Sequence, residues 1–328
     1  MSEPDLVITL EANAQARAVI AATIGSAARI TYLADVAAPD RGAALRAAIV
    51  VLARNTAKEL HAGEPELLIN AQLIQFVTAG VDYIPLAQLP ASVPIASNGG
   101  AYSEPMAEHA VAMAFAAAKR LLIEHNELKR GAFNQFRPNR MLAGSVCGIL
   151  GFGGIGVATA RLMRALGLKV HAINRRGRSD EPVEWIGREN DLDTLLKASD
   201  VLVLSLPLTP KSNRLIGARE LALMKPDAIL INLARGEIVD EAALYNHLKA
   251  TPAFTACIDA WWIEPVRHNT FRMDQPFFEL PNVIGSPHNS ASVRAWRDIA
   301  LRRAVENARR ACLGETPWHL VPPGDRMM

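Results

Sequence analysis

The sequence has few of the residues that form disulfide frameworks or metal sites. Only three of its 328 residues are cysteine, and they lie far apart, at Cys147, Cys257 and Cys312. An odd and scattered set argues against a disulfide framework or a metal knuckle and is typical of a reducing compartment. Aromatic residues make up 5% of the chain and the formal net charge is only +2, so nothing in the composition requires a polyanionic partner.

Long apolar runs are also missing. The longest apolar segment, Ala110–Ala118, is too short to cross a bilayer, and no basic stretch precedes an apolar one near the N-terminus. The pairs Arg302-Arg303 and Arg309-Arg310 have helical spacing, which favours a solvated helix face over a nucleic-acid patch. We therefore expect a cytoplasmic protein that binds neither membranes nor nucleic acid.

Short β-rich runs alternate with helical stretches along the chain, which is typical of an open parallel α/β sheet. The composition between Glu104 and Arg130 predicts one long helix, and a final helix is expected over residues 291–313. The expected strands cover residues 6–9, 30–33, 48–52, 74–78, 93–97, 201–205, 228–232, 255–259 and 283–285.

The most informative motif lies in mid-chain, where Gly151, Gly153 and Gly156 have the spacing G-x-G-x-x-G. A predicted strand precedes this turn, and a helix and a second strand follow it, as a dinucleotide-binding turn requires. The first glycine allows the tight turn, the second lets the backbone approach a pyrophosphate, and the third lets the helix pack closely on the strand. Free amides at the helix N-terminus would hold the phosphates.

A dinucleotide motif in mid-chain predicts an inserted domain. We expect residues 1–98 and 288–328 to form one discontinuous substrate-binding domain, with an NAD(P)-binding Rossmann domain over residues 99–287 between them. The crossings near Asn98–Gly100 and Pro287–Ser290 are then candidate hinges beside a cleft.

Three polar side chains follow predicted strands beyond the glycine turn: Arg235, Glu264 and His288. The carboxyl ends of parallel strands meet at one edge of a sheet, so these side chains are expected to converge. An imidazolium at His288 can protonate an oxygen as hydride reaches its carbon, and Glu264 can orient the ring and raise its pKa. Arg235 can grip a carboxylate in bidentate fashion. Each residue alone fits equally well in an ordinary surface loop, but their joint position favours a catalytic site.

Taken in order along nearly the whole chain, these motifs resemble the D-isomer-specific 2-hydroxyacid dehydrogenase family. The resemblance implies an α/β protein in which a Rossmann domain is inserted in a discontinuous flavodoxin-like α/β substrate-binding domain, usually as a homodimer. The matching stretches are Val77–Asp82, Gly151–Gly156, Leu206–Pro210, Asn232–Asp240, Asp259–Pro265 and Pro287-His288.

The resemblance also implies roles for individual residues. It places the family's catalytic Arg, Glu and His on the three strand-end residues named above. It places the substrate-carboxylate loop on Thr78, Ala79 and Gly80, where backbone amides would cradle the anion. It implies no metal site. Beyond the three motif glycines, the implied cofactor contacts are Gly154, Ile155, Leu206, Pro207, Leu233, Ala234, Asp259 and His288.

The residue that ends the second strand after the glycine turn departs from the family pattern. NAD-specific members usually carry an aspartate there, which accepts hydrogen bonds from the adenosine ribose. This chain has Asn174, followed by Arg175 and Arg176. A carboxylate repels a 2′-phosphate, whereas a neutral amide with guanidinium groups binds it. We therefore favour NADP(H), with NAD(H) as the alternative if both arginines face solvent.

The residues after His288 also differ from the family, where an apolar residue and a glycine are common. Asn289 and Ser290 are good N-cap residues, and we favour a role in capping the final helix. The alternative is a contact with the nicotinamide carboxamide or with a polar substrate tail.

Other departures leave two interpretations open. Trp261 and Trp262 either shape the acyl pocket or pack in the core. The insert Arg267–Phe278 lines either the rim of the active site or a subunit interface. His109, in an alanine-rich helix, is interpreted as a structural histidine rather than a second acid.

These observations together predict an NADPH-preferring reductase that converts a small 2-oxo acid, such as glyoxylate or hydroxypyruvate, to the D-2-hydroxy acid. A phosphite- or formate-type anion dehydrogenase is one alternative, although formate dehydrogenases carry Gln where this chain has Glu264. A nucleotide-sensing, corepressor-like regulator is the other, and the absence of long disordered tails favours an enzyme over it.

Overall fold

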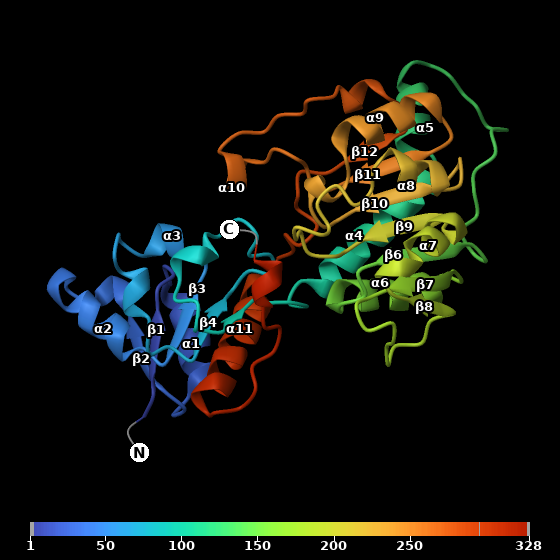
Figure 1. Cartoon of the computed structure of the whole chain (residues 1–328). Coiled ribbons are helices and arrows are strands. Elements are labelled where there is room, and N and C mark those ends of the chain that lie inside the picture. The colour runs from blue at the N-terminus through green and yellow to red at the C-terminus, as the bar shows by residue number, and fades with distance from the viewer. Residues whose placement is uncertain (1–2, 295, 327–328) are drawn as a thin grey trace. The chain divides into compact units, whose positions relative to one another are not determined.

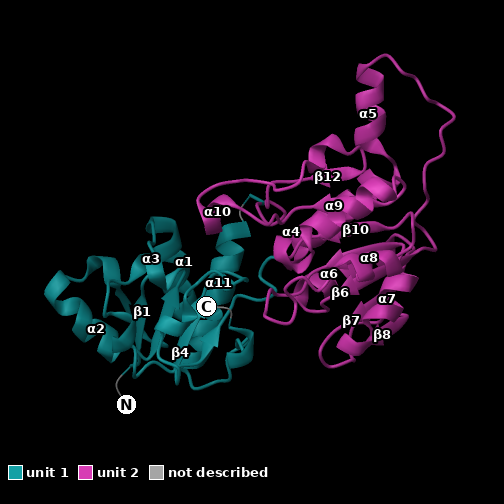
Figure 2. Ribbon diagram, turned by 45° about the horizontal axis from the view of Figure 1, so that its top comes forward, with its two compact units in different colours: residues 1–102, 293–328 teal, residues 103–292 magenta. Residues whose placement is uncertain are grey.

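The structure, a computed structural model, describes residues 3–294 and 296–326. The chain forms two compact units, shown in teal and magenta in Figure 2. Unit 1 comprises residues 1–102 and 293–328, and unit 2 comprises residues 103–292. The chain therefore crosses between units four and five residues later than the sequence predicted, after residue 102 rather than 98 and after residue 292 rather than 287.

Unit 1 is built on a five-stranded parallel sheet with the order β2-β1-β3-β4-β5. Every side chain of β3 and β4 is buried, as expected for central strands of a parallel sheet that is covered on both faces. The elements of unit 1 are β1 (Asp5–Ile8), α1 (Ala14–Ile24), β2 (Arg29–Tyr32), α2 (Arg41–Ala47), β3 (Val50–Ala53), α3 (Thr56–Glu59), β4 (Leu73–Phe76), β5 (Ile95–Ala96) and α11 (Trp296–Cys312).

Helix α11 joins unit 1 although it lies about 200 residues from the sheet in sequence. Its apolar face contributes Ala304, Val305 and Ala308 to the core formed with the strands β1 and β3. Buried amides add specific bonds, because Asn307 Nδ2 donates to Gln75 Oε1 at 2.6 Å. The red helix beside the blue strands in Figure 1 is this C-terminal contribution.

Unit 2 is built on a seven-stranded parallel sheet with the order β12-β11-β10-β9-β6-β7-β8. The order reverses at β6, so the crevice between the ends of β6 and β9 is the topological switch point of a Rossmann sheet. The elements of unit 2 are α4 (Ser103–Ala118), α5 (Leu121–Lys129), β6 (Val146–Leu150), α6 (Gly154–Ala165), β7 (Lys169–Ile173), β8 (Trp185–Gly187), α7 (Leu192–Ala198), β9 (Val201–Leu204), α8 (Ala218–Leu223), β10 (Ile229–Asn232), α9 (Glu241–Ala250), β11 (Thr255–Ile258), α10 (Pro265–His268) and β12 (Val283–Gly285).

The single long helix predicted over residues 104–130 is wrong. Arg120 has a left-handed conformation, with φ of 55°, and this breaks the segment into α4 and α5. The first helix is packed against α6 and the sheet, whereas α5 has no buried residue and extends beyond the rest of unit 2 in Figure 2. Within the described residues, no helix has the length and apolar composition needed to span a membrane.

Candidate active site

The glycine turn joins β6 to α6 and has the conformation that its sequence predicts. Gly151 has a φ of 97°, and a Cβ atom there would lie 2.6 Å from the backbone nitrogen of Leu206. A Cβ atom on Gly156 would collide with the carbonyl oxygen of Gly151. Only glycine therefore fits at these two positions, one because of the turn and the other because the helix packs on it.

The second glycine of the motif leaves an open space beside the helix end. A Cβ atom at Gly153 would meet no heavy atom within 4 Å. Gly153 is also the N-cap of α6 and supplies no side-chain cap, so the first-turn amides, including those of Gly154 and Ile155, are available to an anion. This uncrowded helix N-terminus at the switch point of the sheet fits the pyrophosphate of a nicotinamide dinucleotide.

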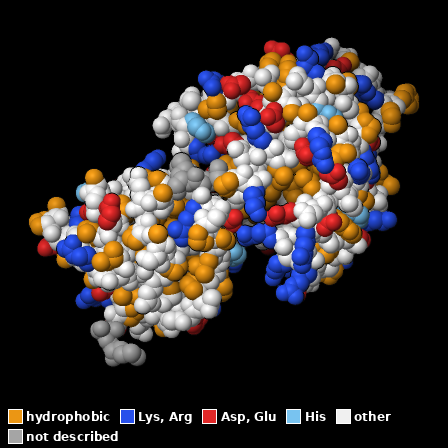
Figure 3. Space-filling view, in the orientation of Figure 1, with side chains coloured by type: hydrophobic (Ala, Val, Ile, Leu, Met, Phe, Trp, Pro, Cys, Tyr) orange, Lys and Arg blue, Asp and Glu red, His pale blue; other side chains and the backbone are white. Residues whose placement is uncertain are grey.

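Asn174 organises the loop that follows β7. Its Oδ1 accepts hydrogen bonds from the backbone amides of Arg176 and Gly177, at 3.0 and 2.7 Å, and its Nδ2 donates to the carbonyl of Arg178. The amide side chain thus closes a tight loop whose arginines 175, 176 and 178 are exposed. Lys and Arg side chains (blue) also gather at the lower end of unit 2 in Figure 3.

Arg235, Glu264 and His288 follow β10, β11 and β12, three adjacent strands of the sheet in unit 2. The His288 ring lies against Glu264, with Nδ1 2.9 and 2.8 Å from the two carboxylate oxygens. The Glu264 side chain is 7% exposed and that of His288 is 34% exposed. The ring is therefore oriented by a buried carboxylate through Nδ1, and its Nε2 makes no hydrogen bond to the described residues.

Glu264 is held in its ionised form. Burial opposes ionisation, but the hydrogen bond and charge of His288, the Trp261 amide and the charge of Arg235 together lower the pKa of Glu264. The Trp261 amide donates to Glu264 Oε1 at 2.7 Å. The guanidinium of Arg235 is itself anchored, because its Nη1 donates to the carbonyl of Ala234 at 2.7 Å.

The turn that carries His288 is held by Asp259, which has no exposed surface. The Asp259 carboxylate accepts hydrogen bonds from Ser286 Oγ and from the amides of Asn289 and Ser290, at 2.5, 3.1 and 3.3 Å. His288 has a φ of 49°, a left-handed conformation that persists in a non-glycine residue only where its surroundings enforce it. The carboxylate of Asp259 supports this turn, and its contact with the cofactor stays a prediction.

The favoured role of Asn289 and Ser290 as caps of the final helix is wrong. Helix α11 begins at Trp296, well beyond both residues. Ser290 is instead buried, and its hydroxyl has no hydrogen-bond partner among the described residues. Asn289 is exposed. The prediction failed because polar residues that precede a helix in sequence can belong to a separate turn. The amides of Asn289 and Ser290 bind Asp259, several residues before the helix begins.

The two tryptophans pack within unit 2. Trp261 is 3% exposed, and its indole Nε1 donates to the carbonyl of Ser286 at 2.8 Å. Trp262 stacks on Phe277 with ring centroids 5.4 Å apart and donates to the carbonyl of Val239. Phe277 and Phe271, both from the insert, also contact Trp261. The insert therefore supports the segment that carries Glu264.

The loop proposed to bind the substrate carboxylate lies in unit 1 and follows β4. Thr78, Ala79 and Gly80 are half-buried. Within the described part of the chain, the amides of Ala79 and Gly80 donate no hydrogen bond. Unpaired and partly exposed N–H groups of this kind are suited to an anion. The structure places the other predicted site residues in unit 2.

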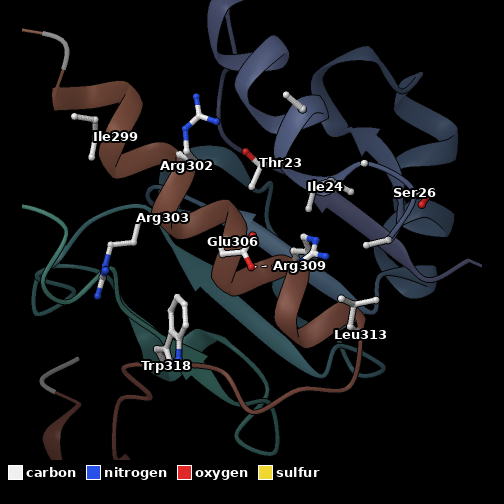
Figure 4. Close-up of a pocket in the computed structure, with 13 residues that line it drawn as sticks. Thr23, Ile24, Ser26, Ile299, Arg302, Arg303, Glu306, Arg309, Leu313 and Trp318 are labelled. Carbon is white, nitrogen blue, oxygen red and sulfur yellow. Dashed lines mark hydrogen bonds and ion pairs between the residues drawn. The ribbon is translucent and has the colours of Figure 1, made fainter.

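An open groove of about 950 Å³ in unit 1 contains none of the predicted site residues. It lies between the C-terminal end of α1 and α11, and Figure 4 shows Trp318 beneath the helix. Arg302 and Arg303 are exposed there, and Arg309 pairs with Glu306 at 3.1 Å. This surface agrees with the solvated helix face expected for the arginine pairs.

Comparison with known proteins extends these observations. The profile of the family described as "D-isomer specific 2-hydroxyacid dehydrogenase, NAD binding domain" matches residues 111–290. Glyoxylate reductase of Thermococcus litoralis is 32% identical over 303 residues, covering 88% of each chain. Glycerate dehydrogenase of Methylorubrum extorquens is 33% identical over 262 residues, covering 77% of this chain and 80% of its own. The crystal structure of a D-isomer specific 2-hydroxyacid dehydrogenase family protein from Aeromonas salmonicida subsp. salmonicida has a TM-score of 0.77 at 26% identity, over 98% of this chain and 99% of that chain.

The fold, the glycine turn and these matches define an NAD(P)-dependent oxidoreductase with a Rossmann unit. The chain belongs to the D-isomer-specific 2-hydroxyacid dehydrogenase family. The family, fold class and enzyme class predicted from the sequence are thereby confirmed. Sequence reasoning missed the hydrogen bonds of Ser286 to Asp259 and His109, and that of the Trp261 indole to Ser286, because they join residues 25 to 177 positions apart.

Proposed function

We propose that this protein is an NADPH-preferring reductase that converts a small 2-oxo acid, with glyoxylate and hydroxypyruvate as first candidates, to the D-2-hydroxy acid. The observation that carries the proposal is the pairing of His288 Nδ1 with the buried carboxylate of Glu264, at 2.8 Å. A paired imidazole with one nitrogen open to the site is the group needed to protonate a keto oxygen. The names of the relatives, glyoxylate reductase and glycerate dehydrogenase, support the same substrate class.

The chain's own residues divide the work of the reaction. The bound reduced nicotinamide would supply the hydride. His288 donates a proton from Nε2 to the keto oxygen of the substrate, and Glu264 stabilises the positive charge of the ring and fixes its orientation. Arg235 binds the substrate carboxylate and polarises the adjacent carbonyl. The substrate-carboxylate loop is proposed to be Thr78, Ala79 and Gly80, because the amides of Ala79 and Gly80 donate no hydrogen bond within the described part of the chain.

The test is a panel of 2-oxo acids assayed with NADPH and with NADH, with phosphite and formate assayed in the opposite direction with NADP and NAD. Oxidation of NADPH by glyoxylate or hydroxypyruvate, yielding the D-hydroxy acid, is the expected result. Turnover of phosphite or formate alone would assign the anion dehydrogenase instead. Failure of every acid, together with a partner captured only when nucleotide is present, would assign the regulator.

The cofactor preference is proposed to come from the Asn174 loop. Replacing Asn174 with aspartate keeps an oxygen that accepts from the amides of Arg176 and Gly177 but adds a negative charge where a 2′-phosphate would lie. We expect the ratio of kcat/KM for NADPH to that for NADH to exceed one in the natural enzyme and to fall about tenfold or more in Asn174→Asp.

The matched control is Asn246→Asp, which adds the same charge at an exposed position of α9. It should leave the NADPH to NADH ratio unchanged. A natural enzyme that clearly prefers NADH would refute the assignment of NADP(H).

A homodimer is proposed to form through α5 and the chain that follows it. This segment exposes large apolar side chains to an unusual degree, with Phe136 90%, Phe133 76% and Met141 73% exposed. Several large apolar side chains exposed within one segment are typical of a protein interface. A second copy of the chain is the expected occupant, since two-fold dimers are the commonest assembly.

We expect a mass of about 71 kDa in solution, twice the chain mass of 35.5 kDa. Phe136→Asp should weaken the dimer about a hundredfold, because a charge cannot be buried there without a partner. Ile69→Asp, at a 64% exposed position of unit 1, is the control that should stay dimeric. Light scattering over a range of concentrations measures both, and a monomeric natural protein would refute the proposal.

A further inference from the structure

A second histidine lies beneath the turn that carries His288. His109 is on α4, the helix packed against β10, β11 and α6, and its side chain is 26% exposed. Its Nε2 lies 3.0 Å from Ser286 Oγ and 3.8 Å from Asp259 Oδ1. A histidine on a helix is thus joined to two residues that shape the catalytic edge of the sheet.

The direction of these hydrogen bonds follows from the number of protons available. Ser286 has one hydroxyl proton and donates it to the Asp259 carboxylate at 2.5 Å. The Ser286 oxygen must then accept from His109, so the His109 ring carries its proton on Nε2. The chain of bonds therefore runs from His109 through Ser286 to the buried charge of Asp259.

Asp259, whose carboxylate is fixed by Ser286, is hydrogen-bonded in turn to the backbone around His288. Its side chain accepts from the Asn289 and Ser290 amides, and its carbonyl oxygen accepts from the His288 amide at 2.9 Å. These bonds enclose the one residue of the turn with a positive φ, His288. A serine whose hydroxyl is fixed at both ends keeps the Asp259 carboxylate in the one orientation that satisfies all of its donors.

We propose that His109 is a positioning residue, which acts through Ser286 and Asp259 to hold the His288 turn in its reactive conformation. The inference rests on the proposed reductase activity and adds a residue to which the sequence assigned no role in the reaction. His109 does not touch substrate in this scheme. Its effect is on the placement of the His288 ring, so its loss changes kcat rather than the binding of nucleotide.

The test compares variants that remove or keep the hydrogen bond. His109→Phe keeps the ring volume without a donor, and His109→Gln keeps a donor of similar reach. Ser286→Ala removes the hydroxyl, and Ser286→Thr keeps it. We expect His109→Phe and Ser286→Ala each to lower kcat for glyoxylate with NADPH about tenfold, with KM for NADPH within twofold of the natural value.

The conservative variants decide between positioning and packing. His109→Gln and Ser286→Thr should recover most of kcat, and the double variant His109→Phe with Ser286→Ala should be no worse than either single variant. His61→Phe, at an exposed position of unit 1, is the control and should match the natural enzyme.

Each outcome has one meaning once the natural enzyme has been assayed. If it reduces no 2-oxo acid, the proposed function fails. If it does, and His109→Phe matches it in kcat, or His109→Gln falls as far as His109→Phe, the positioning role is overturned. If His109→Phe does not fold by circular dichroism, Ser286→Ala and Ser286→Thr carry the same comparison, and equal values for these two overturn the role.

Discussion

Replacing His288 with alanine is expected to lower kcat for 2-oxo acid reduction about a thousandfold, while the Kd for NADPH changes by no more than about twofold. The reason is the position of the ring. Its Nδ1 is paired with Glu264, which leaves Nε2 as the nitrogen that is proposed to donate the proton. Stopped-flow measurement of hydride transfer and fluorescence titration of NADPH separate the two effects.

Two further variants sharpen this result. Glu264→Gln keeps the shape of the acid but loses its charge, and it should retain more activity than His288→Ala, because the ring is still held. His61→Ala is the histidine control, at an exposed position in unit 1. A His288→Ala enzyme with near-normal kcat would defeat the proposed mechanism, and one that no longer bound NADPH would place the residue in cofactor binding instead.

Replacing Arg235 with alanine is expected to lower kcat/KM for the 2-oxo acid about a thousandfold, since two charge-assisted hydrogen bonds to the carboxylate are lost. Arg235→Lys should recover little, because an ammonium group cannot bind a carboxylate through a planar fork. The anchored guanidinium, bonded to the Ala234 carbonyl, also contributes to the low pKa of Glu264, so that pKa should rise in Arg235→Ala.

The control for this prediction is Arg219→Ala, which removes an arginine that is 62% exposed on α8. A 2-oxo substrate without a carboxylate group offers a second check, since its poor turnover should be nearly the same in the natural enzyme and in Arg235→Ala. Equal losses for substrates with and without the carboxylate would show that Arg235 supports the fold of the site rather than binding the substrate.

The sheets could be predicted because their central strands are buried on both faces and carry continuous apolar runs. Strand β9, for example, consists of Val201–Leu204, against the predicted residues 201–205. The short edge strand β8, Trp185–Gly187, was not predicted, because its three residues form no such run. The break at Arg120 was also missed, since a left-handed arginine has no sequence signal comparable to glycine or proline.

The part of the candidate site that could be predicted consists of residues that directly follow parallel strands. A residue that follows a parallel strand has only one edge of the sheet on which to lie, so the proximity of His288 and Glu264 could be expected. The positive φ of His288 and the partly buried contact between Ser286 and His109 could not, because they depend on the packing of α4 against β11. Sequence patterns are local, whereas these bonds join residues up to 177 positions apart.

The discontinuity of unit 1 has a consequence for the order in which the protein is made. The core around β1 and β3 needs Ala304, Val305 and Ala308, and the carbonyl of Ala300 accepts from Asn98 Nδ2 at 2.8 Å. The segment synthesised first thus exposes an apolar sheet face until the last helix leaves the ribosome. Unit 2, which is continuous in sequence, can complete its own core earlier. On the ribosome, unit 2 is therefore expected to fold before unit 1. Until α11 is made, the exposed sheet of unit 1 is the part of the nascent chain with most need of a chaperone.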